Sequence, residues 1–180
     1  MSTIEIHSYD SSWPELFREL GRGLRDALGP VALRIDHIGS TAVPGLAAKP
    51  VIDIQISVAS LEPAAPFRAP LERAGWTFRA DNDDRTKRYF REAPGQRRTH
   101  IHVRRAGSWS EQGALLLRDF LRAHPEFAAD YGALKRQLAT RFGDRRADYT
   151  EAKAPFIWAL LQRADVWAQR IGWTPDASDA

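Results

Sequence analysis

Two short segments of the chain hold the side chains best suited to chemistry. In residues 51–58, apolar and polar residues alternate strictly, and Asp53 is the one carboxylate of the polar set. In residues 97–105, His100 and His102 belong to the polar set of a similar alternation. Alternation of this kind is typical of strands with one buried face. A carboxylate and two neutral imidazoles can bind one divalent cation, whereas histidines of an amphipathic strand can also simply form hydrogen bonds.

A glycine-serine turn precedes the first of these strands. His37 ends an apolar run, and Gly39, Ser40 and Thr41 follow it. Free backbone N–H groups and a hydroxyl at such a turn suit phosphate oxygens. His37 is either part of the same groove or a core histidine with a satisfied ring.

Several cations are candidates for binding an anion near this turn. Lys49 lies just before the 51–58 strand, and Lys153 lies in the first turn of the last predicted helix, where a cation opposes the helix dipole. Arg88 belongs to an arginine-rich stretch between residues 85 and 105. This stretch indicates either an anionic partner such as a nucleotide or a solvated basic face.

The remaining periodicities predict the elements that position these residues. Helices are expected from Trp13 to Leu28, over residues 63–74, 110–123 and 125–142, and from a cap at Thr150 to residue 171. Further strands are expected over residues 3–9, 31–38, 76–79 and 88–92. The pattern predicts an α+β fold, with a mixed β-sheet flanked by helices and a helical C-terminal third.

Size and composition indicate one soluble globular domain. The chain has 180 residues, of which 43% are hydrophobic and 27% are charged, and no cysteine, which excludes disulfides and thiolate metal sites. No apolar run reaches membrane-spanning length, so a cytoplasmic protein without a membrane partner is expected. We expect residues 1–173 to form a single domain and residues 174–180 to be a flexible tail. The oligomeric state stays open.

The stretch HIGSTAVPGLAAKPVIDI (residues 37–54) resembles the GrpB family. THIHV (99–103), RDFLRAHPE (118–126) and YTEAK (149–153) extend the resemblance in matching order and spacing. The family is placed in the nucleotidyltransferase-fold superfamily with DNA polymerase beta. The resemblance therefore implies a nucleotidyltransferase-like sheet, with Gly39 and Ser40 on nucleotide phosphates and strand carboxylates on divalent metals. Members fused to dephospho-coenzyme A kinase imply an assisting role.

Position 55 departs from the pattern that the resemblance implies. A second carboxylate is expected there, but the residue is Gln55, and the neighbouring strand offers His100 and His102 in place of a third carboxylate. We expect a metal-dependent nucleotidyltransferase-like protein that acts on or binds a nucleotide or phosphorylated small molecule. Asp53, His100 and His102 are its candidate catalytic residues, and Asp53, Gln55 and His102 are its candidate metal ligands. The ion would be magnesium or manganese, or zinc because histidines favour it.

Two alternatives remain. The loss of the second carboxylate favours a catalytically impaired module that binds a nucleotide or phosphometabolite. Metal-dependent hydrolysis by His37, Asp53, His100 and His102 is the weaker one. Nucleic acid is not favoured as a partner, because the aromatic residues follow core periodicities and leave no stacking surface.

Overall fold

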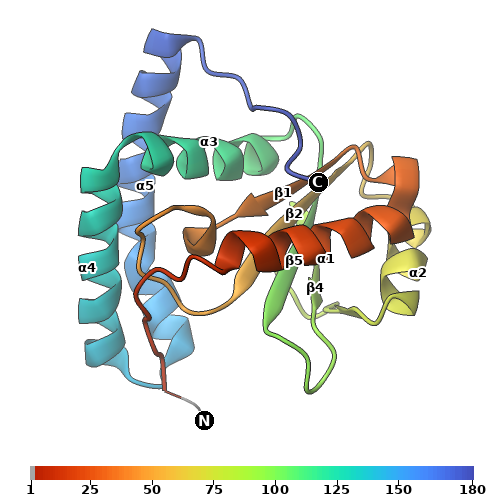
Figure 1. The fold of residues 1–180 in the computed structure, drawn as a ribbon, viewed down its shortest axis with the longest axis horizontal. Coiled ribbons are helices and arrows are strands. Elements are labelled where there is room, and N and C mark those ends of the chain that lie inside the picture. Colours follow the sequence, from red (N-terminus) through yellow and green to blue (C-terminus); the bar gives the residue numbers. More distant parts are fainter. Residues whose placement is uncertain (1–2) are drawn as a thin grey trace.

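The computed structural model describes residues 3–180, and residues 1 and 2 of the predicted domain lie outside the described part (Figure 1). These described residues form five helices and five strands, which follow one another in the order α1 (Trp13–Leu28), β1 (Arg34–Ile38), β2 (Ile52–Val58), α2 (Ala65–Arg73), β3 (Thr77–Phe78), β4 (Lys87–Arg91), β5 (Thr99–Arg105), α3 (Trp109–Ala123), α4 (Pro125–Phe142) and α5 (Arg146–Ile171). Short 3-10 turns, Gly29–Val31 and Ser40–Ala42, flank β1.

The strands form one mixed sheet in the order β1-β2-β5-β4-β3. The central strands β2 and β5 are parallel, and every other pair is antiparallel. This register places Asp53 beside His100 and Gln55 beside His102. Residues paired across neighbouring strands share a face, so the two polar sets predicted from sequence meet on one side of the sheet.

Helices α1 and α2 cover the opposite, apolar side. Its core contains Phe17 and Leu24 of α1 and Phe67 of α2, packed on Ile54 and Ile101 of the central strands. Helices α3, α4 and α5 form a second group beside the sheet with their own apolar core, and α4 runs alongside α5 (Figure 1). The predicted α+β architecture with a helical C-terminal third is confirmed.

Two predictions of secondary structure differ from the structure. Residues 3–9 form no regular strand, and only His7 pairs with Ala48, through hydrogen bonds of 2.8 and 3.0 Å. The last helix begins at Arg146, because Tyr149, expected in a loop, is fully buried in the first turn and holds that turn in place.

Among the described residues, no helix combines the length and the apolarity that crossing a bilayer requires.

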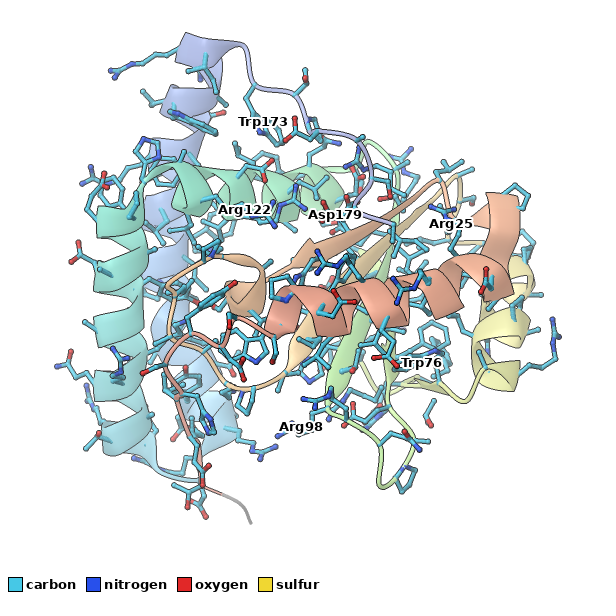
Figure 2. All side chains as sticks on the ribbon, in the orientation of Figure 1. Arg25, Trp76, Arg98, Arg122, Trp173 and Asp179 are labelled. Atoms are coloured by element: carbon cyan, nitrogen blue, oxygen red, sulfur yellow. The ribbon has the colours of Figure 1, made fainter. Side chains whose placement is uncertain are left out.

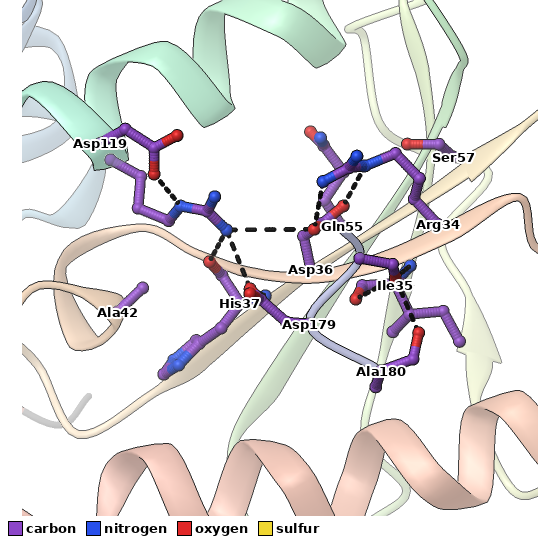
Figure 3. A network of polar contacts seen from close by, with 12 residues as sticks. Arg34, Ile35, Asp36, His37, Ala42, Gln55, Ser57, Asp119, Asp179 and Ala180 are labelled. Carbon is purple, nitrogen blue, oxygen red and sulfur yellow. Dashed lines mark hydrogen bonds and ion pairs between the residues drawn. The ribbon is translucent and has the colours of Figure 1, made fainter. Parts of the chain in front are cut away.

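The predicted flexible tail is instead docked on the edge strand β1 (Figure 3). The backbone N–H of Ala180 donates to the carbonyl of Ile35 at 3.1 Å, and Ser178 Oγ accepts from the Ile35 N–H at 2.8 Å. Asp179 Oδ2 accepts from the His37 N–H at 2.9 Å and from Arg118 Nη1 at 2.8 Å. An edge strand exposes unpaired backbone groups, and the tail satisfies them here.

Candidate functional site

Asp53, His100 and His102 converge on the polar side of the sheet. Asp53 Oδ1 lies 3.0 Å from His100 Nδ1 and 3.3 Å from His102 Nε2, and the three donor atoms lie within 4.8 Å of one another. Two ligands about 2.1 Å from one ion, at angles of 90–109°, lie roughly 3.0–3.4 Å apart. The separations from Asp53 therefore fit a carboxylate and two imidazoles around one divalent cation, and without an ion they are hydrogen bonds.

The protonation states of this cluster also suit a cation. Burial would raise the pKa of the Asp53 carboxyl, but the hydrogen bonds and charges of His100 and His102 outweigh it and hold that pKa well below its usual range. Burial lowers the pKa of His102 to about 4, despite the attraction of Asp53. At neutral pH the cluster thus presents a carboxylate and a neutral His102, the forms in which these side chains bind metal.

The outer nitrogens of the two rings are the unusual feature of the cluster. Within residues 3–180, the buried Nε2 of His100 and Nδ1 of His102 have no hydrogen-bond partner. Buried polar atoms are normally paired. If a cation took the inner nitrogens, the proton of each neutral ring would move to the outer nitrogen.

The glycine-serine turn contacts Asp53 directly. Gly39 has a φ of 70°, and a Cβ added there would lie 2.8 Å from Asp53 Oδ2. Only glycine combines this left-handed backbone with so close an approach. Ser40 then begins a 3-10 turn, and its hydroxyl accepts a 2.8 Å hydrogen bond from Lys135 Nζ of α4.

Lysines and tyrosines from α4, from α5 and from the segment before β2 form a wall beside this turn. The ammonium of Lys135 lies 4.5 Å from the centre of the Tyr131 ring, and those of Lys49 and Lys153 lie 4.6 and 4.7 Å from the centre of the Tyr149 ring. Lys135 is only 3% exposed, and burial, followed by the charge of Lys153, lowers its pKa to about 7. Such crowding of cations around one carboxylate favours an anion between them.

The comparisons with known proteins decide the family. The family model described as GrpB protein matches residues 3–163. This chain belongs to the GrpB family. UPF0157 protein YqkA of Bacillus subtilis is 37% identical over 164 residues, which cover 91% of this chain and 48% of that protein. Dephospho-CoA kinase of Mycobacterium tuberculosis is 37% identical over 191 residues, which cover 92% of this chain and 47% of the kinase. The chain thus spans about half the length of these relatives.

Solved structures agree with the GrpB assignment. Conserved protein GrpB from Enterococcus faecalis superposes with a TM-score of 0.82 and 33% identity, over 91% of this chain and 99% of that one. The Cid1 poly(U) polymerase superposes with a TM-score of 0.54 over 76% of this chain and 44% of its own, at 15% identity. That identity shows a shared fold alone, so this GrpB chain has a nucleotidyltransferase-like fold.

Two of the predicted site residues of this GrpB protein lie on the other side of the sheet. His37 pairs with Ile54 in register and stacks on Phe17 of α1, with ring centres 4.8 Å apart. Its Nε2 lies 3.0 Å from Thr41 Oγ1, and burial lowers its pKa to about 3. Arg88 forms an ion pair of 2.6 Å with Glu62. The structure brings neither His37 nor Arg88 into the groove of Asp53.

Thr41 and Gln55 have internal partners. The Thr41 hydroxyl donates to the carbonyl of Val51 at 3.2 Å and thus ties the turn to β2. The fully buried Gln55 accepts from Arg104 through Oε1 and donates from Nε2 to the Glu111 carbonyl at 3.2 Å. Its amide oxygen is therefore occupied by the guanidinium of Arg104, and the structure does not place Gln55 as a metal ligand.

Lys135 is a candidate site residue that sequence reasoning missed. It lies four residues after Tyr131 and three before Leu138, in the inward stripe of α4. Lysine is almost never fully buried unless it is paired. A lysine inside an apolar helical stripe was therefore the one sequence feature that pointed to it.

Proposed function

We propose that this GrpB protein binds the phosphate groups of a nucleotide or of another phosphorylated small molecule beside one divalent cation. The observation that supports it is the convergence of the Gly39–Ser40 turn, the Asp53 carboxylate and Lys135 from three separate elements. A bound cation neutralises negative charge on phosphate oxygens and stabilises the charge that develops when a nucleotidyl group is transferred.

In this proposal Asp53 and the histidines bind the cation, and the lysines bind the phosphate groups. Asp53, His100 and His102 hold the cation, and their two imidazole nitrogens favour manganese or zinc over magnesium. Lys135 and Lys153 face the phosphate oxygens from α4 and α5, and the turn at Ser40 offers its backbone N–H groups and hydroxyl. Lys135 needs no large movement to serve, because it already lies on the Ser40 hydroxyl at 2.8 Å.

An apolar cavity next to the turn suits the organic part of such a ligand. Its volume is about 200 Å³, and it is lined by the turn and by apolar residues of α3 and α5, among them Ala114, Leu117 and Ile157. Ligand sites are mostly apolar with a few polar groups that fix orientation. We assign a base or a similar flat group to this cavity.

Binding without transfer is the second candidate, and Gln55 favours it. Transfer with two cations requires carboxylates that hold both, but this position carries a neutral amide bonded to Arg104. A one-cation site retains the binding step and supports at most a transfer that depends on a single ion.

Calorimetry and a pyrophosphate-release assay test both candidates. Nucleoside triphosphates are titrated with magnesium, manganese or zinc into the native chain and into Asp53→Asn, with the exposed His7→Gln as a control for loss of an imidazole. We expect binding that requires the cation, that is lost in Asp53→Asn and that persists in His7→Gln. Pyrophosphate release with manganese supports transfer, and binding without release supports the module. Equal binding by Asp53→Asn and the native chain refutes the site.

A further inference from the structure

Two arginines of α3 hold the two ends of the glycine-serine turn. Arg118 Nη1 donates to the backbone carbonyl of His37 at 3.2 Å, and Arg122 Nε donates to the backbone carbonyl of Ala42 at 2.9 Å. The two arginines are four residues apart on one helix, so their side chains project from the same face. Together they fix the points where the chain enters and leaves the turn.

Arg118 depends on the C-terminal tail for one of its carboxylate partners. The side chain of Arg118 is buried, and the Nη1 atom that holds the turn also donates to Asp179 Oδ2 at 2.8 Å. Its Nε donates to Asp119 Oδ1 at 2.7 Å, whereas Asp36 Oδ1 lies farther away, at 4.0 Å, and already pairs with another arginine. A buried guanidinium is costly unless carboxylates pair with it. Asp179 thus keeps this guanidinium paired at the atom that holds the turn.

The residue before the tail reaches the same network at a second point. The indole N–H of Trp173 donates to Asp119 Oδ2 at 3.2 Å, and Asp119 Oδ1 lies 3.7 Å from Arg122 Nη1. In Figure 2, Trp173, Arg122 and Asp179 lie around α3, on the side where the tail returns to the sheet. Figure 3 shows Asp119 and Asp179 joined to one guanidinium by dashed lines. The last residues of the chain are therefore connected to both arginines that hold the turn.

The same network borders the cavity that we assign to the organic part of the ligand. Arg118 lines this cavity together with Gly39 and Ser40 of the turn. Asp179 also accepts from the backbone N–H of His37, two residues before Gly39, at 2.9 Å. A tail that leaves β1 would therefore release the chain where it enters the turn. The cation ligands stand on β2 and β5, which follow β1 in the sheet and lie farther from the tail.

We propose that Trp173 and the tail form a clamp, residues 173–180, that positions the glycine-serine turn for phosphate binding. Asp179 is its positioning residue: it acts through Arg118 and β1, and it is not itself a ligand of the cation or of the phosphate groups. The effect of the clamp on ligand binding rests on the proposed function, whereas the coupling between tail and turn does not. Detaching the tail should weaken nucleotide binding and leave the cation site intact.

Gly21 of α1 offers a way to detach the tail without changing any residue of this network. A Cβ added at Gly21 would lie 2.8 Å from the Cβ of Ala180, and carbon atoms in contact prefer about 3.5–4.0 Å. Ala180 is bound to the Ile35 carbonyl at 3.1 Å and to Arg25 at 2.9 Å, so a shift of its methyl group strains both hydrogen bonds. A Cβ at Gly23, on the same helix, would meet no described atom within 4 Å. Gly23→Ala is therefore a matched control with the same gain in helix propensity.

Amide hydrogen exchange of the full chain reports on the tail and on the turn separately. The tail amides, those of Ile35 and His37, donate to side chains of the tail. The turn amides, those of Ala42 and Val43, donate to carbonyls within the turn, each at 3.2 Å. Amides exchange faster when local opening exposes them, so the two sets show whether loosening the tail also loosens the turn. This measurement needs no ligand and is therefore independent of the proposed function.

We expect Gly21→Ala and Asp179→Ala to speed the exchange of both sets of amides by roughly tenfold or more. In calorimetry, both variants should bind adenosine 5′-triphosphate with manganese roughly tenfold more weakly than the native chain. Manganese alone should bind them as tightly as it binds the native chain, and a tail that only stabilised the fold would not separate these two affinities. Gly23→Ala should behave as the native chain does. So should Gly21→Ala combined with Ala180→Gly, because the second change removes the opposing methyl group.

Several results would overturn the clamp. They are a nucleotide affinity that stays native while the tail amides exchange faster, a tighter nucleotide affinity, which would make the tail a competitor for Arg118, and equal losses of manganese and nucleotide affinity. Tail amides that exchange as slowly in both variants as in the native chain overturn it too, because the tail then does not depend on these contacts. If the native chain binds no nucleotide, the proposed function fails and the turn amides decide: faster exchange in the variants upholds the coupling, and unchanged exchange overturns it.

Discussion

Replacing Lys135 with methionine should make the protein more stable and less able to bind phosphate. The lysine is 3% exposed, and burial lowers its pKa from 10.5 to about 7. The unfolded chain therefore binds more protons than the folded one between about pH 7 and 10.5, so Lys135 costs stability that is recovered as the pH rises. Methionine keeps a similar length and volume without the charge.

The size of the effect follows from the two pKa values. Each unit of pKa difference corresponds to ~1.36 kcal/mol. Burial of Lys135 therefore costs roughly 5 kcal/mol at pH 6, where the folded lysine is charged, and roughly 2 kcal/mol at pH 9, where only the unfolded lysine keeps its proton. The substitution also removes the hydrogen bond to Ser40 and the contact with the Tyr131 ring, together worth about 2 kcal/mol. Those losses are nearly the same at both pH values. The gain in unfolding free energy from the substitution should therefore be roughly 3 kcal/mol larger at pH 6 than at pH 9.

Urea unfolding at pH 6 and pH 9 measures this difference. Lys135→Met should exceed the native chain in unfolding free energy by roughly 3 kcal/mol more at pH 6 than at pH 9. Arg141→Met, at an exposed position in the last turn of the same helix, should show no such pH dependence, because the charge of Arg141 does not contribute to the lowered pKa of Lys135. Calorimetry with a nucleoside triphosphate and manganese should find affinity at least tenfold weaker in Lys135→Met, roughly 1.4 kcal/mol. Equal stability differences at both pH values, or unchanged affinity, would refute the reasoning.

Three further substitutions probe the turn, the tail and the opposite face of the sheet. Gly39→Ala should lower the free energy of unfolding by roughly 1–3 kcal/mol and weaken manganese binding in calorimetry, because its Cβ would lie 2.8 Å from Asp53 Oδ2; manganese affinity equal to that of the native chain would contradict this contact. Asp179→Ala should cost roughly 2–4 kcal/mol in urea unfolding, because it removes one carboxylate partner of the buried Arg118; an unchanged midpoint would show that the tail does not contribute. His37→Gln should cost roughly 1–2 kcal/mol through its lost stacking on Phe17 yet leave manganese affinity unchanged, and weakened metal binding would place His37 in the site after all.

The part of the site that sequence patterns predict is the part that lies on alternating strands. The period of two in residues 51–58 and 97–105 assigns Asp53, His100 and His102 to polar faces, and the parallel register of β2 and β5 brings those faces together. The same rule favours the core position over the groove for His37. It shares the face of Ile35, and antiparallel pairing with β2 places that face against α1.

Contacts that join distant segments were beyond this reasoning. Lys135 lies 95 residues from Ser40, and Asp179 lies 61 residues from Arg118, yet each pair meets at 2.8 Å. The composition of residues 174–180 favoured disorder, since it offers almost no apolar surface. What orders the tail is the unpaired edge of β1 and a buried guanidinium, and neither is visible in the tail's own sequence.

The environment of Gln55 explains why a neutral amide occupies the position of the expected second carboxylate. Gln55 lies fully buried between Arg104 of β5 and the first turn of α3, where Glu111 also accepts a 2.7 Å hydrogen bond from Ser57. An amide can accept from Arg104 and donate to the Glu111 carbonyl at once, whereas a carboxylate can only accept. A carboxylate here would therefore leave that carbonyl without its donor and would pair with Arg104 before it reached a second cation. The position that would hold a second ion thus joins the sheet to α3, which leaves Asp53 and its two histidines as the candidate metal ligands of this groove.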